Sequence, residues 1–172
     1  MRVLGVDPGM HETGWAVLDG AAPGAVPRLV ASGLIRTEPG VPLPERLKAI
    51  HAGLSRVLAE HAPQACAIEE MFFTTIATTV RATLQARGVA LLAAAQAGSP
   101  VHEYNPKTVK LTLTGSGRAE KAQMQTVVQK ALGLAERLRP NDVADAAAIA
   151  LCHLRTGRLK GLRVLDAWGG RR

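Results

Sequence analysis

Residues 2–19 read RVLGVDPGMHETGWAVLD and hold two short apolar runs on either side of the turn sequence DPG. The first run, 2–6, is followed by proline and glycine, which favour a tight turn. The second run, 13–18, contains the β-branched and aromatic residues that favour strands, and a third strand-like run follows at 28–35. Three such runs with short connections predict an antiparallel meander.

The rest of the chain alternates helix and strand signals. Apolar residues recur every three or four positions from Leu43 to Leu58, which predicts an amphipathic helix whose other faces carry charged residues, including Arg46. The later predicted elements are a strand at 65–68, a helix at 76–97, a strand at 101–104, a helix opened by Asn105-Pro106, a helix at 119–132, and a helix capped by Asn141 that ends near Leu154.

This order predicts an α/β fold with a five-stranded mixed sheet flanked by helices. A right-handed crossover makes the 65–68 strand parallel to its neighbour, and we expect that neighbour to be the first strand. The carboxyl ends of these two strands would then meet at one edge of the sheet.

Composition narrows the class of protein. The chain has 172 residues, 47% of them hydrophobic, and a formal net charge of +7, which favours a single domain with a polyanionic partner. We expect no membrane association, because no uncharged apolar stretch of about 18 residues occurs. The first residues do not resemble a signal peptide, so a cytoplasmic location is expected. Cys66 and Cys152 are interpreted as small buried hydrophobes.

Four acidic residues stand at predicted element ends. Asp7 ends the first strand and Glu69 follows the fourth, so their carboxylates would repel each other unless a hard cation such as Mg²⁺ lay between them. Asp142 and Asp145 share one face at the start of the last helix. An unpaired carboxylate at Asp145, within the apolar run VADAAAIA, would be costly.

Each acid also has an ordinary explanation. Asp7 is a common turn residue, Glu69 could face solvent at a strand end, and Asp142 suits a helix N-terminus. Their joint placement predicts two divalent ions that hydrolyse a phosphodiester bond. No GxSxG or HExxH motif offers other chemistry, and His11 is interpreted as a solvated loop histidine or, less simply, a proton shuttle.

Several motifs together resemble the RuvC family of bacterial Holliday junction resolvases, from residue 3 to about 154. The matching motifs are Leu4–Gly9, Thr13-Gly14, Ala67–Glu69, Gln85–Ala90, Ala119–Lys121 and Asp142–Ala146. The chain departs from the family pattern at Leu84, where relatives often have glycine, and 76–83 matches weakly.

This resemblance implies an RNase H-like fold, a homodimer, and Mg²⁺-dependent paired nicks in opposing strands of a four-way DNA junction, with Mn²⁺ as a substitute metal. It also implies a partnership with the RuvA–RuvB branch-migration complex. The family's catalytic and metal-binding acids fall on Asp7, Glu69, Asp142 and Asp145. Its DNA-contacting lysines fall on Lys110 and Lys121, and its base-stacking aromatic on Phe72.

Basic and aromatic residues predict further DNA contacts. Phe72-Phe73 stands out in a chain with only 3% aromatic residues, and one ring could stack on an unpaired base while the other packs in the core. Cations flank the glycine-containing loop 115–117, which suits phosphate, although a solvated charged face is the simpler alternative. These cations are Lys107, Lys110, Arg118 and Lys121.

The domain assignment is a nuclease domain at 1–155 and a basic C-terminal tail at 156–172, interpreted either as a DNA-binding segment or as a soluble terminus. The small residues of 76–97, with Gly88 at the centre, favour close helix packing in a two-fold dimer. Two other functions fit parts of the pattern. They are a nucleotide-binding domain of the actin and sugar-kinase type, and a junction-binding module without catalysis.

Overall fold

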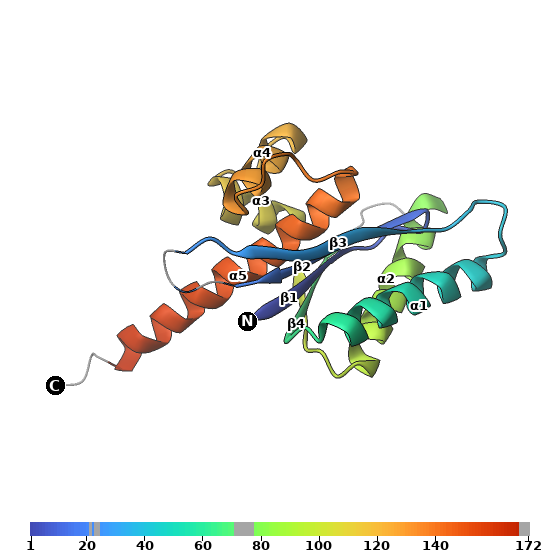
Figure 1. The fold of residues 1–172 in the computed structure, drawn as a ribbon, viewed down its shortest axis with the longest axis horizontal. Coiled ribbons are helices and arrows are strands. Elements are labelled where there is room, and N and C mark those ends of the chain that lie inside the picture. The colour runs from blue at the N-terminus through green and yellow to red at the C-terminus, as the bar shows by residue number, and fades with distance from the viewer. Residues whose placement is uncertain (21, 23–24, 71–77, 169–172) are drawn as a thin grey trace.

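The computed structural model describes residues 1–20, 22, 25–70 and 78–168 (Figure 1). Its sheet has the order β3-β2-β1-β4-β5. The strands are β1 (Arg2–Asp7), β2 (Glu12–Asp19), β3 (Arg28–Arg36), β4 (Ala65–Glu69) and β5 (Val101–Tyr104). β1, β2 and β3 form an antiparallel meander, and β4 runs parallel to both β1 and β5. The predicted mixed sheet and the pairing of the first and fourth strands are therefore confirmed.

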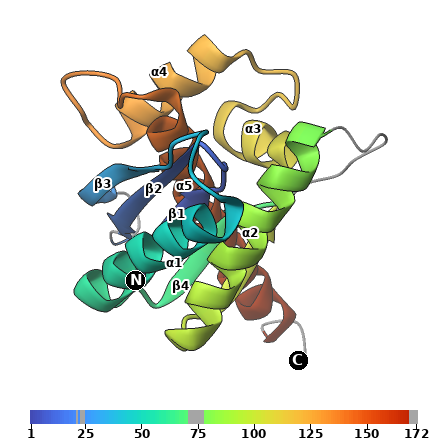
Figure 2. The same cartoon turned by 90° about the vertical axis from the view of Figure 1, so that its right-hand side faces the viewer.

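Helices cover both faces of the sheet (Figure 2). They are α1 (Leu43–His61), α2 (Thr78–Gln96), α3 (Pro106–Thr114), α4 (Lys121–Ala131) and α5 (Asn141–Trp168). α1 and α2 pack on one face, while α5, with α3 and α4 beside it, packs on the other. Alternate strand residues supply the two cores: Val3 faces α5, whereas Leu4 and Val6 face α1 and α2.

The buried face of α1 differs from the predicted one. Arg46, expected on a polar face, is only 9% exposed, whereas Leu43 is 39% exposed. The Arg46 guanidinium is satisfied by Thr37 Oγ1 at 2.9 Å and by the Met10 carbonyl at 3.0 Å. The helix therefore buries a hydrogen-bonded cation four residues before Ile50, on the same apolar stripe.

The predicted starts of the last three helices are met to different degrees. The Asn105 side chain accepts a hydrogen bond from the Lys107 N–H, so the predicted cap is confirmed. The next helix begins at Lys121, two residues later than predicted. Asn141 is the first residue of α5 rather than its cap, and its side chain accepts a hydrogen bond from Gln125.

The last helix is longer than predicted. α5 continues past Leu154 to Trp168, because residues 155–168 have no proline and include three Leu and three Arg, which are good helix formers and outweigh two glycines. The division into a 1–155 domain and a 156–172 tail stays a prediction, and the helix crosses that boundary without a break. Among the residues that the structure describes, no helix has the length and apolarity to cross a membrane.

Candidate active site

Sheet geometry brings Asp7 and Glu69 to one place. β1 and β4 are parallel, with Val6 opposite Ile68, so the residues that end the two strands emerge at the same edge. Side chains alternate along a strand. Asp7 therefore lies on the side of Val3, and Glu69 on the side of Ala67, which is the side covered by α5.

Two glycines let α5 approach this edge. A Cβ on Gly5 would lie 2.1 Å from the Ala146 carbonyl oxygen, and a Cβ on Gly14 would lie 2.1 Å from the Asp142 carbonyl oxygen. Gly14 also pairs with Asp7 across β1 and β2. The first turn of α5, which carries Asp142, is thus seated directly beside Asp7, and Asp145 follows one turn later.

The resulting cluster is strongly negative. Burial, and then the charges of Glu69, Asp145 and Asp142, raise the pKa of Asp7 to about 8. Burial and the Asp145 charge likewise raise the pKa of Glu69. Four carboxylates from β1, β4 and α5 therefore share one field, as expected for a site that receives a cation.

Lys121, at the start of α4, partly neutralises this field. Its Nζ lies 3.0 Å from an Asp145 oxygen, in a pair that is half exposed on the lysine side. Burial lowers the pKa of Lys121, but the Asp145 hydrogen bond and the nearby charges of Asp145, Asp142 and Asp7 outweigh it and leave that pKa raised. The lysine thus stays charged beside the acids.

A small cavity of about 190 Å³ opens at the cluster. Its polar side is formed by Glu69, Asp145, Lys110 and Lys121, and its apolar side comes from α3, α4 and α5. The structure therefore brings two of the four predicted DNA-contacting cations to the acids. Lys107 and Arg118 are exposed and lie toward the α3–α4 loop, where Gly117 packs against the Lys107 side chain.

The fit to a divalent metal rests on donor chemistry. Four carboxylates are the hard oxygen ligands that Mg²⁺ prefers. Within the described ranges, no group of three or more His, Cys, Asp and Glu side chains is yet close enough to enclose an ion. Lys121 pairs with Asp145 in this arrangement, and the four carboxylates fit a divalent cation as a donor set.

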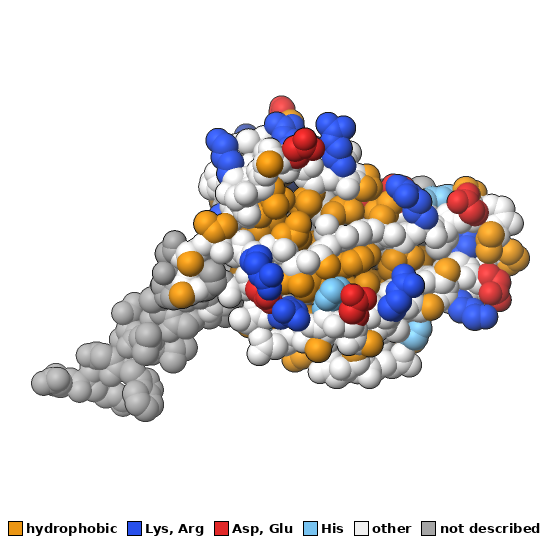
Figure 3. All heavy atoms as spheres, viewed as in Figure 1, with side chains coloured by type: hydrophobic (Ala, Val, Ile, Leu, Met, Phe, Trp, Pro, Cys, Tyr) orange, Lys and Arg blue, Asp and Glu red, His pale blue; other side chains and the backbone are white. Residues whose placement is uncertain are grey.

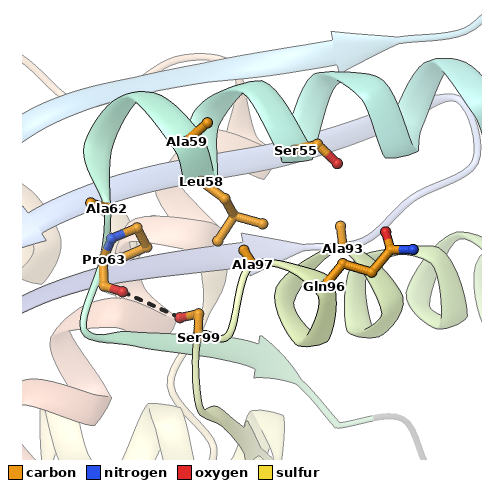
Figure 4. A pocket seen from close by; sticks show the side chains of 9 residues that line it. All are labelled: Ser55, Leu58, Ala59, Ala62, Pro63, Ala93, Gln96, Ala97 and Ser99. Carbon is orange, nitrogen blue, oxygen red and sulfur yellow. Dashed lines mark hydrogen bonds between the residues drawn. The ribbon is translucent and has the colours of Figure 1, made fainter.

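Other predicted or prominent features lie elsewhere. Phe72 and Phe73 fall outside the described residues. His11 is exposed, with its Nδ1 3.3 Å from Arg46, as expected for a loop histidine. A larger cavity, of about 480 Å³, lies between the C-terminal halves of α1 and α2 (Figure 4) and contains none of the four acids.

Sequence reasoning missed the residues that position the main chain around the site. Arg46 donates a hydrogen bond to the Met10 carbonyl in the turn after Asp7. Its position four residues before Ile50 was the feature of the sequence that could have predicted its burial. The seating of Gly14 against Asp142 had no local signal, because it depends on the tertiary packing of α5.

Comparisons with known proteins agree with the fold and the motifs. The family model for crossover junction endodeoxyribonuclease RuvC matches residues 3–153. The chain is 49% identical to the Chloroflexus aggregans enzyme of that name, over 91% of this chain and 94% of that protein. It is 47% identical to the Pelotomaculum thermopropionicum enzyme, over 89% and 92%.

Solved structures extend the match to three dimensions. Thermus thermophilus RuvC superposes with a TM-score of 0.87 at 39% identity, covering 93% of this chain and 97% of that one. The same protein in complex with Holliday junction substrate superposes at 0.83 and 38% identity, covering 92% and 96%. The fold is therefore the predicted RNase H-like α/β fold. The chain belongs to the RuvC family of crossover junction endodeoxyribonucleases.

Proposed function

We propose that this chain resolves four-way DNA junctions by metal-dependent nicking of opposing strands, with Asp7, Glu69, Asp142 and Asp145 as its catalytic residues. The observation that carries the proposal is the meeting of carboxylates from β1, β4 and α5 on one side of the sheet edge. Membership of a junction endonuclease family and the net charge of +7 support a DNA substrate.

The metal we propose is Mg²⁺, with Mn²⁺ as a substitute and two ions in each site. The four acids would hold these ions, because carboxylate oxygens are their preferred ligands. When bound, two such ions activate water and stabilise the leaving oxygen of a phosphodiester. Lys121 keeps its positive charge beside the acids. Once bound metal ions neutralise the carboxylates, its ammonium group can leave Asp145 and contact a DNA phosphate.

DNA contacts are proposed around the same opening. Lys110 and Lys121 line the cavity beside the acids and suit the phosphates nearest the cut. Lys107 and Arg118, exposed near the α3–α4 loop, suit phosphates farther along the strand. Other basic side chains, with acidic ones between them, lie at the surface over α4 (Figure 3). We further propose that Phe72 stacks on an unpaired base near the crossover, with Phe73 as the second candidate for this contact.

A homodimer is proposed because a two-fold enzyme suits two symmetric cuts. The exposed face of α2 supports it: Leu84 is 40% and Leu92 is 51% exposed, and Gly88 lies between them. The T. thermophilus relative is described in complex with a Holliday junction, which supports the same substrate here. Action beside RuvA–RuvB in the cytoplasm follows from the family resemblance.

Replacing Asp7 by Asn tests the function. We expect Asp7→Asn to lower nicking of a synthetic four-way junction in Mg²⁺ by about 10³-fold or more, as when a central catalytic group is removed. Binding to the junction, measured by gel shift in EDTA, should be equal or tighter because a charge that repels phosphate is lost. Normal nicking by this variant would contradict the catalytic assignment.

The two competing functions give different results. A binding module without catalysis predicts that wild type binds junctions but nicks none at any Mg²⁺ concentration. A nucleotide-binding domain of the sugar-kinase type predicts that ATP raises the melting temperature and is hydrolysed. We expect neither behaviour from wild-type protein.

A further inference from the structure

We propose that Arg87 is a positioning residue for Glu69, holding the end of β4 from the face of the sheet opposite the carboxylate cluster. The proposal rests on the proposed nuclease function, in which Glu69 is a metal ligand. It adds a residue that contacts Glu69 through the main chain and not through its carboxylate.

Arg87 makes two contacts that join three elements. Its Nε donates to the main-chain carbonyl of Glu69 at 3.3 Å, and its Nη2 forms an ion pair with Glu103 on β5. Only 17% of the Arg87 side chain is exposed. A planar guanidinium can satisfy two acceptors at fixed angles, so α2 is tied at one point to the ends of both β4 and β5.

Arg87 and the Glu69 carboxylate lie on opposite faces of the sheet, so Arg87 supports the strand end and is not part of the cluster. Glu69 directs its side chain to the α5 face, whereas Ala86 and Ala90, beside Arg87, pack in the core of the opposite face. On the other side of the strand end, the Glu70 N–H donates to the Tyr104 carbonyl at 2.8 Å. The main chain at 69–70 is thus held by both β5 and α2 just where the carboxylate must be aimed.

This support matters because Glu69 stands in a repulsive field. Its carboxylate is coupled to Asp145, and without a bound cation the acids push one another apart. The Arg87 hydrogen bond to the main chain of Glu69 can resist that displacement. Loss of such supporting contacts typically weakens metal binding about 10- to 100-fold.

The test uses full-length protein and four variants. Arg87→Met removes both contacts at similar length, and Arg87→Lys keeps the charge but not the two-pronged geometry. Glu103→Gln removes the ion pair and leaves the Arg87 contact with Glu69. Arg56→Met, at an exposed position of α1 away from the proposed dimer face, is the matched control.

Two experiments are made on each variant. Steady-state kinetics give kcat and KM for junction nicking, and paramagnetic resonance gives the Mn²⁺ affinity of the protein alone. We expect Arg87→Met to lower kcat about 10- to 100-fold and to weaken Mn²⁺ binding about tenfold, with KM nearly unchanged. Arg87→Lys should fall between Arg87→Met and wild type, and Glu103→Gln should lie closer to wild type. Arg56→Met should match wild type.

Two results would overturn the proposal. One is an Arg87→Met protein with the kcat and Mn²⁺ affinity of the Arg56→Met control. The other is a loss that disappears at higher protein concentration or lower temperature, because Arg87 would then act on assembly or folding. If wild type itself nicks no junction, the proposed function fails, and the Mn²⁺ comparison of Arg87→Met with Arg56→Met still decides the role of Arg87.

Discussion

Asp7 lies where acidic side chains from three elements meet, and this environment opposes the ionisation of its carboxyl group. Its pKa is raised to about 8, first by burial and then by Glu69, Asp145 and Asp142. A carboxyl with a raised pKa in the folded protein holds its proton more tightly there than in the unfolded chain. The stability it contributes is therefore present below the unfolded pKa, near 3.8, and is lost as the pH rises toward 8.

Asp7→Asn removes this titration, so we expect it to stabilise the metal-free protein at high pH. In EDTA, the melting temperature of the variant should exceed that of wild type by about 3 °C or more at pH 8. The two proteins should converge as the pH falls below 3.8, where Asp7 becomes protonated in both the folded and unfolded states. Calorimetry across this pH range measures the difference.

Asp19→Asn supplies the control of opposite sign. The Asp19 hydrogen bond to Arg2, and further contacts with Arg28, hold the pKa of that carboxyl at about 2. Its contribution is present above the unfolded pKa and is lost as the pH falls through 2. Asp19→Asn should therefore lower the melting temperature slightly at neutral pH, and a gain there, or parallel curves for Asp7→Asn and wild type, would contradict this electrostatic picture.

At the scale of elements, the site depends on how closely α5 approaches β1 and β2. A Cβ at Gly14 would lie 2.1 Å from the Asp142 carbonyl oxygen, a contact with main chain that no side-chain rotation relieves. Gly14→Ala should push the first turn of α5 outward, lowering junction nicking about tenfold or more and stability by about 1–3 kcal/mol.

Gly40→Ala is the matched control for this change, because a Cβ at Gly40 meets nothing within 4 Å. Nicking rates and urea unfolding midpoints of the two variants are compared side by side. Equal rates and midpoints for Gly14→Ala and Gly40→Ala would mean that the glycine contact does not set the position of Asp142.

The elements also separate what sequence could and could not predict. Strand and helix periods identified all five strands and the parallel neighbours β1 and β4, which is why Asp7 and Glu69 could be brought together in advance. Periodicity places Arg46 on the stripe of Ile50, but it could not predict that the guanidinium is buried, since that burial needs the Met10 carbonyl and Thr37 from distant loops. The cluster's α5 members were predicted from local pattern, but their seating depends on tertiary packing.

At the scale of the whole molecule, the proposed dimer face of α2 makes a prediction about assembly. Gly88 is exposed, and a Cβ there meets nothing within 4 Å in the isolated chain. If Gly88 faces solvent, replacing it by alanine should only stabilise the helix, by about 1 kcal/mol. In a close helix–helix contact, Gly88→Leu should instead shift sedimentation from dimer toward monomer at micromolar concentrations.

Gly40→Leu, in open space away from α2, should leave the sedimentation of the wild-type dimer unchanged. A wild-type protein that sediments as a monomer at all concentrations would remove the dimer proposal. A fully dimeric Gly88→Leu protein would instead place the contact on another surface.

The most direct measurement of the central claim compares two DNA substrates. Wild-type protein is incubated with a synthetic four-way junction and with a linear duplex of the same sequence, in Mg²⁺ and in EDTA, and the products are separated on denaturing gels. We predict paired nicks in two opposing strands of the junction in Mg²⁺ only, with the duplex intact. Equal cutting of the duplex, cutting in EDTA, or an intact junction in Mg²⁺ would contradict the claim.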